Sequence, residues 1–528
     1  MHAANLLLRG SGQGRQVPRR LPQILRVSTR TYHPRQVRQH TSQNRSSGSD
    51  TSSTPKSPLQ GARWASSWRP WAPAIAVVLV AGGYYLTMKQ HSETGDDSTS
   101  RQRLVILGSG WGAVSVIQGL NTRKFEITVV SPRDYFLFTP LLPSCTTGLI
   151  NERSLMESIY SFFPGTKNSI RYHQAAATEI DPKRKIIVTK DPSSGRCSEI
   201  PFDQLVVAVG AETASFGIPG VQQHACFLKE VEDARMIRRR VVDCIQNAMR
   251  HAKGSDERRR LLNMIVVGGG PTGVEFAAEL QDLFDQDLVQ LFPEVKDDLR
   301  VSLIEALPNV LPMFSQKLID FTRSSFEKQE INVRTKTMVT EVGKESLKVK
   351  VTNPDGSKSL EEIPFGLLVW AAGITCNSLI RNLMNKIPEQ RDSRRGLAID
   401  DNLVVNGTKD IWALGDCAAS CNPPTAQVAH QQGAYLARVL NALDQNSACA
   451  ITGPFVFQSQ GALAYIGDDE AVADIKWLGK TFASGGPLTG LFWRGAYVSM
   501  CLSGRNRLLI LADWVSAKFF GRPFASEK

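Results

Sequence analysis

Residues 264–280 read MIVVGGGPTGVEFAAEL, a short apolar run that leads through glycines into a helix-forming segment. Met264–Val267 is predicted to be a buried strand. Gly268, Gly270 and Gly273 then follow the spacing G-x-G-x-x-G, which joins a strand to a helix through a tight turn. The first glycine permits the turn, the second lets a pyrophosphate approach the backbone, and the third lets the helix pack against the strand. The stretch therefore predicts a Rossmann-type unit with phosphates at the helix N-terminus.

The next predicted strand indicates which nucleotide this unit prefers. Leu299–Ile304 reads LRVSLI and is followed by Glu305. An acid at this position accepts a hydrogen bond from a ribose 2′-hydroxyl and repels a 2′-phosphate, so Glu305 favours NADH over NADPH. Gly268 and Glu305 lie 37 residues apart, which is longer than usual. The excess is an amphipathic insertion, residues 281–298, whose acids do not follow the spacing of a calcium-binding loop.

A second turn of the same kind lies 160 residues upstream, where residues 103–120 read RLVILGSGWGAVSVIQGL. Gly108, Gly110 and Ala113 fit the spacing G-x-G-x-x-A, and Gly112 is an additional glycine in the turn. Two such turns, each between a predicted strand and a predicted helix, indicate two bound dinucleotides. The fold class is therefore predicted to be α/β, with two Rossmann-type dinucleotide-binding domains.

The two copies differ at the end of their second strands. In the upstream copy, Glu126–Val130 is the predicted second strand, and it ends at Ser131 rather than at an acid. Arg133 and Asp134 are near but displaced. The sequence therefore does not identify the residue that contacts the ribose of the first dinucleotide.

Length and charge limit the possible partners. A chain of 528 residues is long enough for about two or three domains. The formal net charge is +12, but residues 1–70 hold twelve Lys and Arg against one acid, so the remaining residues carry only +1. A nucleic-acid surface needs a basic patch on the folded part, so we expect no nucleic-acid partner.

The nine cysteines contain no C-x-x-C pair, which argues against a disulfide framework, an iron–sulfur cluster or a zinc site. No metal is expected. The cysteines are Cys145, Cys197, Cys226, Cys244, Cys376, Cys417, Cys421, Cys449 and Cys501.

The N-terminal segment is typical of a mitochondrial targeting sequence. Residues 1–49 contain nine arginines and no acid, so residues 1–60 are predicted to be a transit peptide and linker, with a disordered basic tail as the alternative. Residues 72–88 carry no charge and would form a helix of roughly 26 Å. Residues 70–88 are therefore predicted to be a transmembrane segment or a cleaved sorting segment. Arginines precede it and acids follow it, which places the body in the intermembrane space.

From Arg103 to Gly521 the chain resembles the type II (alternative) NADH dehydrogenases, which are single-chain NADH:quinone oxidoreductases. Several local motifs carry this resemblance, in order and in kind. They are SPRDYFLFTPLLPS (131–144), VVAVGAETASFGIPG (206–220), GGGPTGVEFAAEL (268–280), VWAAGI (369–374), IWALGDCA (411–418) and AQVAHQQGAYLA (426–437).

The resemblance implies a domain order. The first glycine turn would bind FAD, and the second would bind NADH as substrate. The FAD-binding domain would occupy residues 101–225, be interrupted by the NADH-binding domain at 226–375, and resume at 376–440. Residues 441–528 would form a C-terminal helical region that associates with membrane and supports a homodimer.

The resemblance also implies roles for single residues. Asp416 would bind the FAD ribitol, although an N-cap of a following helix is the alternative. Gln427 and Gln431 match two glutamines by the flavin ring and the quinone pocket, and His430 lies on the same helical face. His430 could supply a proton or be a structural histidine. Glu275 matches a carboxylate between the two substrates, with support of the helix dipole as the alternative.

The C-terminal stretch Pro487–Phe524 combines many apolar and aromatic residues with five basic ones and a single acid, Asp513. This composition is typical of a helix that lies in the headgroup layer, although core packing or dimerisation would also explain it. Neither half of the stretch is long enough to span a bilayer.

These observations predict NADH:ubiquinone oxidoreduction at the mitochondrial inner membrane, without proton pumping. Two alternatives remain open. A sulfide:quinone oxidoreductase would need a redox pair of cysteines, for which Cys197 and Cys376 are the candidates. A protein like apoptosis-inducing factor would use its redox state to control partner binding.

Overall fold

The structure is a computed structural model that describes residues 101–163, 170–443, 453–477 and 480–523. The predicted transit peptide (1–60) and the predicted transmembrane or sorting segment (70–88) lie outside the described residues. None of the helices among the described residues is both long enough and apolar enough to cross a bilayer.

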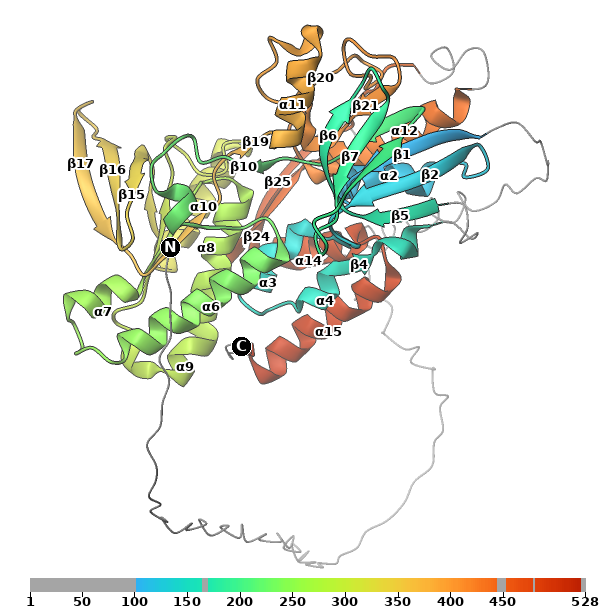
Figure 1. The fold of residues 1–528 in the computed structure, drawn as a ribbon. Helices are drawn as coiled ribbons and strands as arrows, with labels where there is room; N and C mark the ends of the chain where they lie inside the picture. Colours follow the sequence, from blue (N-terminus) through green and yellow to red (C-terminus); the bar gives the residue numbers. More distant parts are fainter. Residues whose placement is uncertain (1–100, 164–169, 444–452, 478–479, 524–528) are drawn as a thin grey trace, which may run out of the picture. The chain divides into compact units, whose positions relative to one another are not determined.

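The first sheet has five parallel strands in the order β21-β9-β1-β2-β5 (Figure 1). They are β1 Gln102–Leu107, β2 Phe125–Ser131, β5 Ile170–Gln174, β9 Gln204–Val207 and β21 Ile411–Ala413. Strand β21 joins the sheet about 200 residues after β9, so a long insertion separates the two parts of this domain.

The insertion contains a second sheet of five parallel strands in the order β11-β18-β12-β13-β14. They are β11 Cys226–Phe227, β12 Asn263–Val267, β13 Arg300–Ile304, β14 Asn332–Arg334 and β18 Leu367–Trp370. The α/β class with two Rossmann-like parallel sheets is therefore confirmed.

Alternate residues of the central strands face different layers, because successive side chains of a strand point to opposite sides of the sheet. Met264 and Val266 of β12 pack with helices, whereas Ile265 and Val267 pack on an antiparallel sheet. The helices on the second domain are α6 Val231–Ala248, α8 Pro271–Leu283 and α10 Gln316–Lys328, and the antiparallel sheet is β15 Thr337–Val342, β16 Ser346–Thr352 and β17 Lys358–Pro364.

The first domain is layered in the same way. Helix α2 (Trp111–Gly119) packs on α12 (Ala426–Ala442) on one face of the sheet. The other face is covered by α11 (Ser378–Lys386) and an antiparallel sheet. That sheet consists of β6 Ala176–Asp181, β7 Ile186–Lys190 and β8 Cys197–Pro201.

A short two-stranded ribbon connects the two domains. Strand β10 (Glu212–Thr213) pairs antiparallel with β19 (Ile374–Thr375), so the chain leaves the first domain and returns to it at one place. The indole nitrogen of Trp370 donates a hydrogen bond to the carbonyl of Ala214 at 2.9 Å, which ties the ribbon to the second sheet.

The remaining short elements connect these layers. The short strands are β3 Tyr135–Leu137, β4 Met156–Ser158, β20 Leu397–Ala398 and β22 Ala418–Ala419. The short helices are α3 Leu142–Thr146, α4 Glu152–Leu155, α5 Val221–His224, α7 Asp256–Leu261 and α9 Val289–Leu291. The insertion at 281–298 contains the end of α8, a π-helical turn, α9 and a 3-10 turn.

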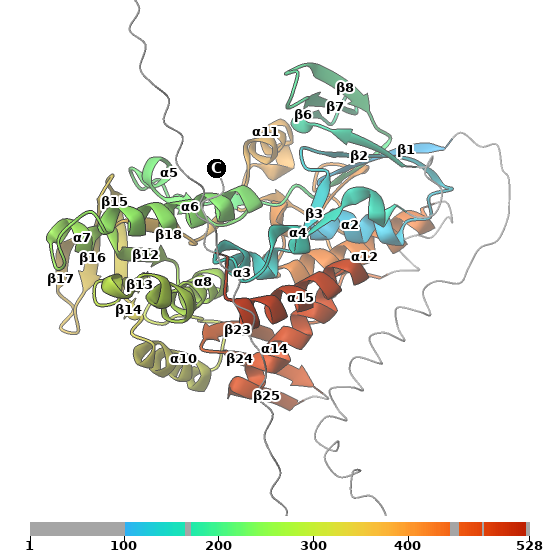
Figure 2. The same cartoon turned by 90° about the horizontal axis from the view of Figure 1, so that it is seen from below.

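The C-terminal region contains strands as well as helices, so the prediction of a helical region was correct only in part. An antiparallel sheet, β23 Ala462–Gly467, β24 Glu470–Trp477 and β25 Lys480–Gly486, precedes α14 Pro487–Met500 and α15 Gly504–Phe520 (Figure 2). The reason is local: Asp468 and Asp469 both adopt positive φ, 50° and 58°, which suits the tight turn of a hairpin. Strand β23 packs on α8, and α15 packs on α4.

Candidate active site

The two glycine turns have the same geometry. The φ angles of Gly108 and Gly268 are +114° and +119°, a region that favours glycine. Their amide nitrogens donate to the carbonyls of Val130 at 2.8 Å and Ile304 at 2.9 Å, which are on the neighbouring strands. In each domain the first glycine of the turn is therefore hydrogen-bonded to the C-terminal end of the second strand.

The next glycine of each motif begins a helix and leaves space in front of it. Gly110 and Gly270 are the N-cap residues of α2 and α8, and no atom lies within 4 Å of the position that a Cβ would occupy. Free backbone N–H groups at such an end attract phosphate. The third small residue serves packing, because a Cβ on Gly273 would overlap the carbonyl of Gly268, and Ala113 is fully buried.

The second domain carries the predicted acid at the end of its second strand. The carboxylate of Glu305 accepts hydrogen bonds from the amides of Gly269 at 2.5 Å and Leu307 at 2.7 Å. It therefore lies directly against the glycine turn. In the first domain the hydroxyls of Ser131 and Ser109 contact each other at 3.0 Å in the corresponding place, where the second domain has Glu305.

Asp416 lies on a 3-10 turn (Gly415–Cys417) that immediately follows β21 at the edge where the first glycine turn also lies. Residues 418–419 form strand β22, so the alternative that Asp416 caps a helix is wrong. Burial raises the pKa of Asp416, and the nearby cation of Lys229 lowers it in part. Among the described residues no hydrogen bond reaches its carboxylate, which therefore has free acceptor sites.

Gln432 is a site residue that the sequence prediction missed. Its side chain is fully buried, and its Oε1 accepts a hydrogen bond of 2.8 Å from the amide of Gly415, next to Asp416. Its Nε2 has no hydrogen-bond partner within the described part of the chain. A buried amide usually satisfies both of its polar ends, so this donor is available to a ligand. The adjacent Gly433, which allows close packing on α2, was the signal for this buried face of α12.

The three predicted residues of α12 are held by different neighbours. Gln427 donates to the carbonyl of Gly461 at 3.1 Å, and Gln431 donates to the carbonyl of Gln458 at 2.9 Å. Both side chains thus bind the segment that leads into β23. His430 Nδ1 lies 2.7 Å from the Ser115 hydroxyl on α2, and desolvation lowers the pKa of His430.

Glu275 is buried where α8 meets β23 and α14. Its Oε1 accepts hydrogen bonds from the Tyr465 amide at 3.2 Å and from the Tyr497 hydroxyl at 3.3 Å. Burial raises the pKa of Glu275 to about 8. The carboxyl is therefore mostly protonated at neutral pH, and it can both hold and release a proton.

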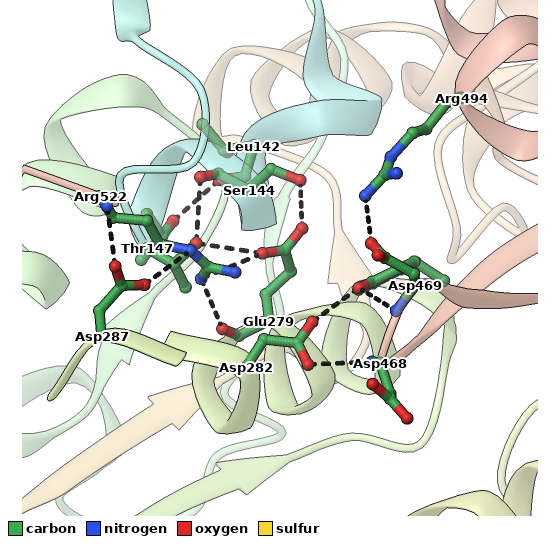
Figure 3. Close-up of polar contacts among 12 residues, drawn as sticks. Leu142, Ser144, Thr147, Glu279, Asp282, Asp287, Asp468, Asp469, Arg494 and Arg522 are labelled. Carbon is green, nitrogen blue, oxygen red and sulfur yellow. Dashed lines mark hydrogen bonds and ion pairs between the residues drawn. The ribbon is translucent and has the colours of Figure 1, made fainter. Parts of the chain in front are cut away.

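Two further buried acids, Glu279 and Asp282, lie on the same face of α8 (Figure 3). Glu279 accepts hydrogen bonds from the hydroxyls of Ser144 at 2.6 Å and Thr147 at 3.2 Å, and it pairs with Arg522 at 3.5 Å. These partners come from α3, from the residue just after it and from the C-terminal end.

Asp282 connects α8 with the hairpin of the C-terminal region. It accepts a hydrogen bond of 2.6 Å from the Tyr465 hydroxyl and one of 2.9 Å from the Asp468 amide. Burial raises the pKa of Asp282 to about 6. The sequence prediction included Glu275 alone, because the two other acids look like ordinary helix residues until their burial is known.

No cysteine among the described residues forms a disulfide, and no group of three or more His, Cys, Asp or Glu among them could bind a metal. Cys197 is exposed on β8, whereas Cys376 is buried after β19. No contact between them is found in the described ranges.

Two parallel sheets, each with a glycine turn at a helix N-terminus and one inserted into the other, define the class of two-domain pyridine nucleotide oxidoreductases. Residues 102–433 match the pyridine nucleotide-disulphide oxidoreductase family, and residues 459–523 match the NDH2 C-terminal domain. The chain belongs to the pyridine nucleotide-disulphide oxidoreductase family and carries the NDH2 C-terminal domain.

Proteins of similar sequence and structure agree with this assignment. The chain is 45% identical over 510 residues to an external alternative NADH-ubiquinone oxidoreductase, mitochondrial, of Yarrowia lipolytica, covering 88% of each chain. It is 41% identical to external NADH-ubiquinone oxidoreductase 2, mitochondrial, of Saccharomyces cerevisiae, covering 80% of this chain and 82% of that one. The structure of NDH2 from Plasmodium falciparum in complex with NADH superimposes with a TM-score of 0.76 at 28% identity, covering 81% of this chain and 100% of that one.

Proposed function

We propose that this protein is a type II NADH:ubiquinone oxidoreductase, a flavoprotein that passes electrons from NADH through FAD to a membrane quinone without pumping protons. The observation that carries the proposal is the insertion of one glycine-turn domain into the other, followed by an NDH2 C-terminal domain. Its relatives bear the names of mitochondrial NADH-ubiquinone oxidoreductases.

The first domain fits FAD. Gly108, Gly110 and the start of α2, where Gly112 and Ala113 lie, offer an open helix end for the pyrophosphate. Asp416 offers free carboxylate oxygens to the ribitol hydroxyls, and Gln432 offers an unpaired buried donor. Bound FAD supplies hydride acceptance at its N5 atom and the return of two electrons to an acceptor. The protein therefore has to bind and orient, and it needs neither a nucleophile nor a metal.

The second domain fits NADH. Gly268, Gly270 and Gly273 open the end of α8 to the pyrophosphate, and the carboxylate of Glu305 lies against this turn where an adenosine ribose would bind. A carboxylate repels an additional phosphate, which favours NADH over NADPH.

Side chains from α8 and α12 would form the site at which the flavin passes electrons to the quinone. Glu275 holds a proton close to neutral pH, and quinone reduction consumes protons. Gln427 and Gln431 bind the segment before β23 to α12 of the first domain, so this segment would line the quinone site. His430 contacts Ser115 on α2 and would thereby hold α12 in position at this site.

The C-terminal helices provide the surface for the membrane. Their exposed apolar side chains are Leu488, Leu491, Phe492, Leu508, Leu511, Val515, Phe519 and Phe520. Basic residues such as Arg494, Arg505 and Lys518 accompany them, so α14 and α15 combine an apolar surface with positive charge. This combination suits insertion into an anionic lipid headgroup layer, from which a lipid-soluble quinone could enter. Part of the same surface would serve a homodimer.

The N-terminal sequence and relatives that are named mitochondrial and external support a proposal for the location. We place the protein at the mitochondrial inner membrane, with its body in the intermembrane space. The arginine-rich residues 1–49 support targeting to the mitochondrion, and the charge asymmetry around residues 70–88 supports this orientation in the membrane.

The two alternatives lack structural support. The cysteines that a sulfide:quinone oxidoreductase would need differ in burial, and no contact joins them in the described part of the chain. A nucleic-acid-binding role like that of apoptosis-inducing factor needs a basic body, whereas residues 71–528 carry a net charge of only +1.

The test is the stoichiometry of the reaction on proteoliposomes that contain ubiquinone. We expect one quinol for each NADH oxidised and no membrane potential. Quinone reduction by sulfide but not by NADH would contradict the proposal. Generation of a membrane potential would contradict its non-electrogenic part.

A further inference from the structure

Phe216 has an unusual backbone for a large side chain. Its φ angle is 52°, and 66% of its surface is exposed, although it lies in the linker between the two domains. Bulky residues rarely adopt positive φ, because Cβ then crowds the backbone. Such strain persists where a function maintains it, and an exposed phenyl ring gains nothing from burial in the protein itself.

The ring of Phe216 lies against Gly373, close to the second glycine turn. A Cβ on Gly373 would come within 2.9 and 3.1 Å of two ring carbons, so only glycine permits this contact. Gly373 follows Ala371 and Ala372 directly, and both of these approach Gly268: a Cβ on Gly268 would lie 2.7 Å from the Ala371 oxygen and 3.1 Å from the Ala372 nitrogen. The ring is therefore within a few residues of the turn that faces the pyrophosphate.

The strand order shows which half of the dinucleotide would meet this ring. A dinucleotide spans the crevice where the strand order reverses, which in this sheet lies between β12 and β18. Glu305 at the end of β13 marks the adenosine side. Gly373 follows β18 on the opposite side, and the linker there leads back to the first domain. The nicotinamide half must lie on this side to meet the flavin.

We propose that Phe216 contacts the nicotinamide half of NADH and positions it for hydride transfer, with Gly373 leaving room for the ring. The inference rests on the proposed function, because it takes the second domain as the NADH site. A flat apolar ring suits the face of the nicotinamide, and an exposed one is free to contact it. Phe216 is a positioning residue, and it does not take part in the chemistry.

The test compares Phe216→Ala and Phe216→Gly with the unaltered protein by anaerobic stopped flow. The dependence of flavin reduction on NADH concentration gives the Kd, and we expect it to rise about tenfold in both variants. Phe216→Gly also relaxes the backbone, so its melting temperature should not fall. Phe216→Tyr keeps the ring and should restore NADH affinity. The rate of reoxidation by a short-chain quinone should stay unchanged in all three variants.

ADP-ribose, which lacks the nicotinamide, identifies the half that is contacted. Its Kd, measured as inhibition of flavin reduction, should be the same in Phe216→Ala as in the unaltered protein. Leu360→Ala removes another exposed apolar side chain, on β17, and is the matched control. An unchanged Kd for NADH in Phe216→Ala, or an equal loss for ADP-ribose, would overturn the inference. If NADH failed to reduce the flavin of the unaltered protein, the proposed function itself would fail.

Discussion

Glu275 is a carboxyl group removed from water, and its expected chemistry follows from that environment. Because burial raises the pKa of Glu275 to about 8, the carboxyl is mostly protonated at pH 7 and loses its proton as the pH rises through about 8. We expect the rate of quinone reduction to fall as the pH rises through about 8. Glu275→Gln should lower this rate about a hundredfold and remove the change near pH 8. Flavin reoxidation by a short-chain quinone, measured from pH 6 to 9, checks this.

Stability measurements provide the control for that prediction. The folded protein keeps the proton of Glu275 while the unfolded chain loses it near the ordinary value of 4.5. The contribution of this group to stability is therefore complete below pH 4.5 and declines until about pH 8. Glu275→Gln should remove this decline, which amounts to a few kcal/mol. An identical pH dependence of unfolding in both proteins would show that Glu275 has an ordinary pKa.

We expect Glu305 to decide the choice of nucleotide by its charge. Its carboxylate lies against the second glycine turn, where a 2′-phosphate would be repelled. Glu305→Gln should raise the ratio of kcat/KM for NADPH to that for NADH by about tenfold, because the repulsion is lost. Steady-state rates with the two nucleotides measure this ratio. An unchanged ratio would remove Glu305 from its assigned role.

The sequence was sufficient for residues whose place in the fold depends on local spacing. The glycines of both turns and Glu305 could be predicted, because strand, turn and helix follow one another in the chain. Gln432 and Phe216 could not, because their neighbours Gly415 and Gly373 come from other segments. Only the adjacent Gly433 distinguishes the buried Gln432 from Gln427 and Gln431, which are half-buried on α12.

At the scale of elements, helix α8 joins three parts of the molecule through its buried acids. Glu279 is 2% exposed and pairs with Arg522, which is 4% exposed. Arg522 also pairs with Asp287 in the π-helical turn that continues α8, so the end of α15 is fixed to the segment that follows the second glycine turn. Removing one partner of a buried pair leaves the other charge without compensation.

Arg522→Met should therefore lower the free energy of unfolding by about 3 kcal/mol. Adding Glu279→Gln should recover part of this loss, because the stranded carboxylate is then neutral. Arg103→Met, which breaks an exposed pair with Asp203, is the control and should cost less than about 1 kcal/mol. Denaturant unfolding of the four proteins measures these differences. Equal losses for Arg522→Met and Arg103→Met would contradict the account.

The first two strands of each Rossmann-type unit could be predicted to within about two residues, because they are largely apolar runs around the glycine turns. Predicted Met264–Val267 corresponds to Asn263–Val267, and predicted Leu299–Ile304 to Arg300–Ile304. The hairpin of β23 and β24 was missed. Its turn uses two aspartates at positive φ instead of glycine or asparagine, so the usual turn signal is absent.

At the scale of the whole molecule, the exposed apolar surface of α14 and α15 requires an explanation. Phe519 and Phe520 are 77% and 87% exposed at the end of α15, and each would gain about 2 kcal/mol on entering lipid. Phe519→Ser combined with Phe520→Ser should weaken binding to anionic vesicles by more than about tenfold. Cosedimentation with vesicles measures this binding. Leu360→Ser, an equally exposed change on β17, should have no effect.

The same double variant separates membrane docking from chemistry. It should lose activity with a long-chain ubiquinone in vesicles and keep activity with a soluble short-chain quinone. Loss of activity with both quinones would indicate damage to the active site. Unchanged vesicle binding would indicate that this surface serves a dimer interface instead.

The central claim is that one chain brings NADH and FAD together and passes two electrons on to a quinone. Anaerobic stopped flow on the purified protein tests it most directly. We predict that NADH bleaches the flavin absorbance in a single saturable phase and that a short-chain ubiquinone then restores it in full. A protein that binds no flavin, or whose flavin stays oxidised under excess NADH, would contradict the account.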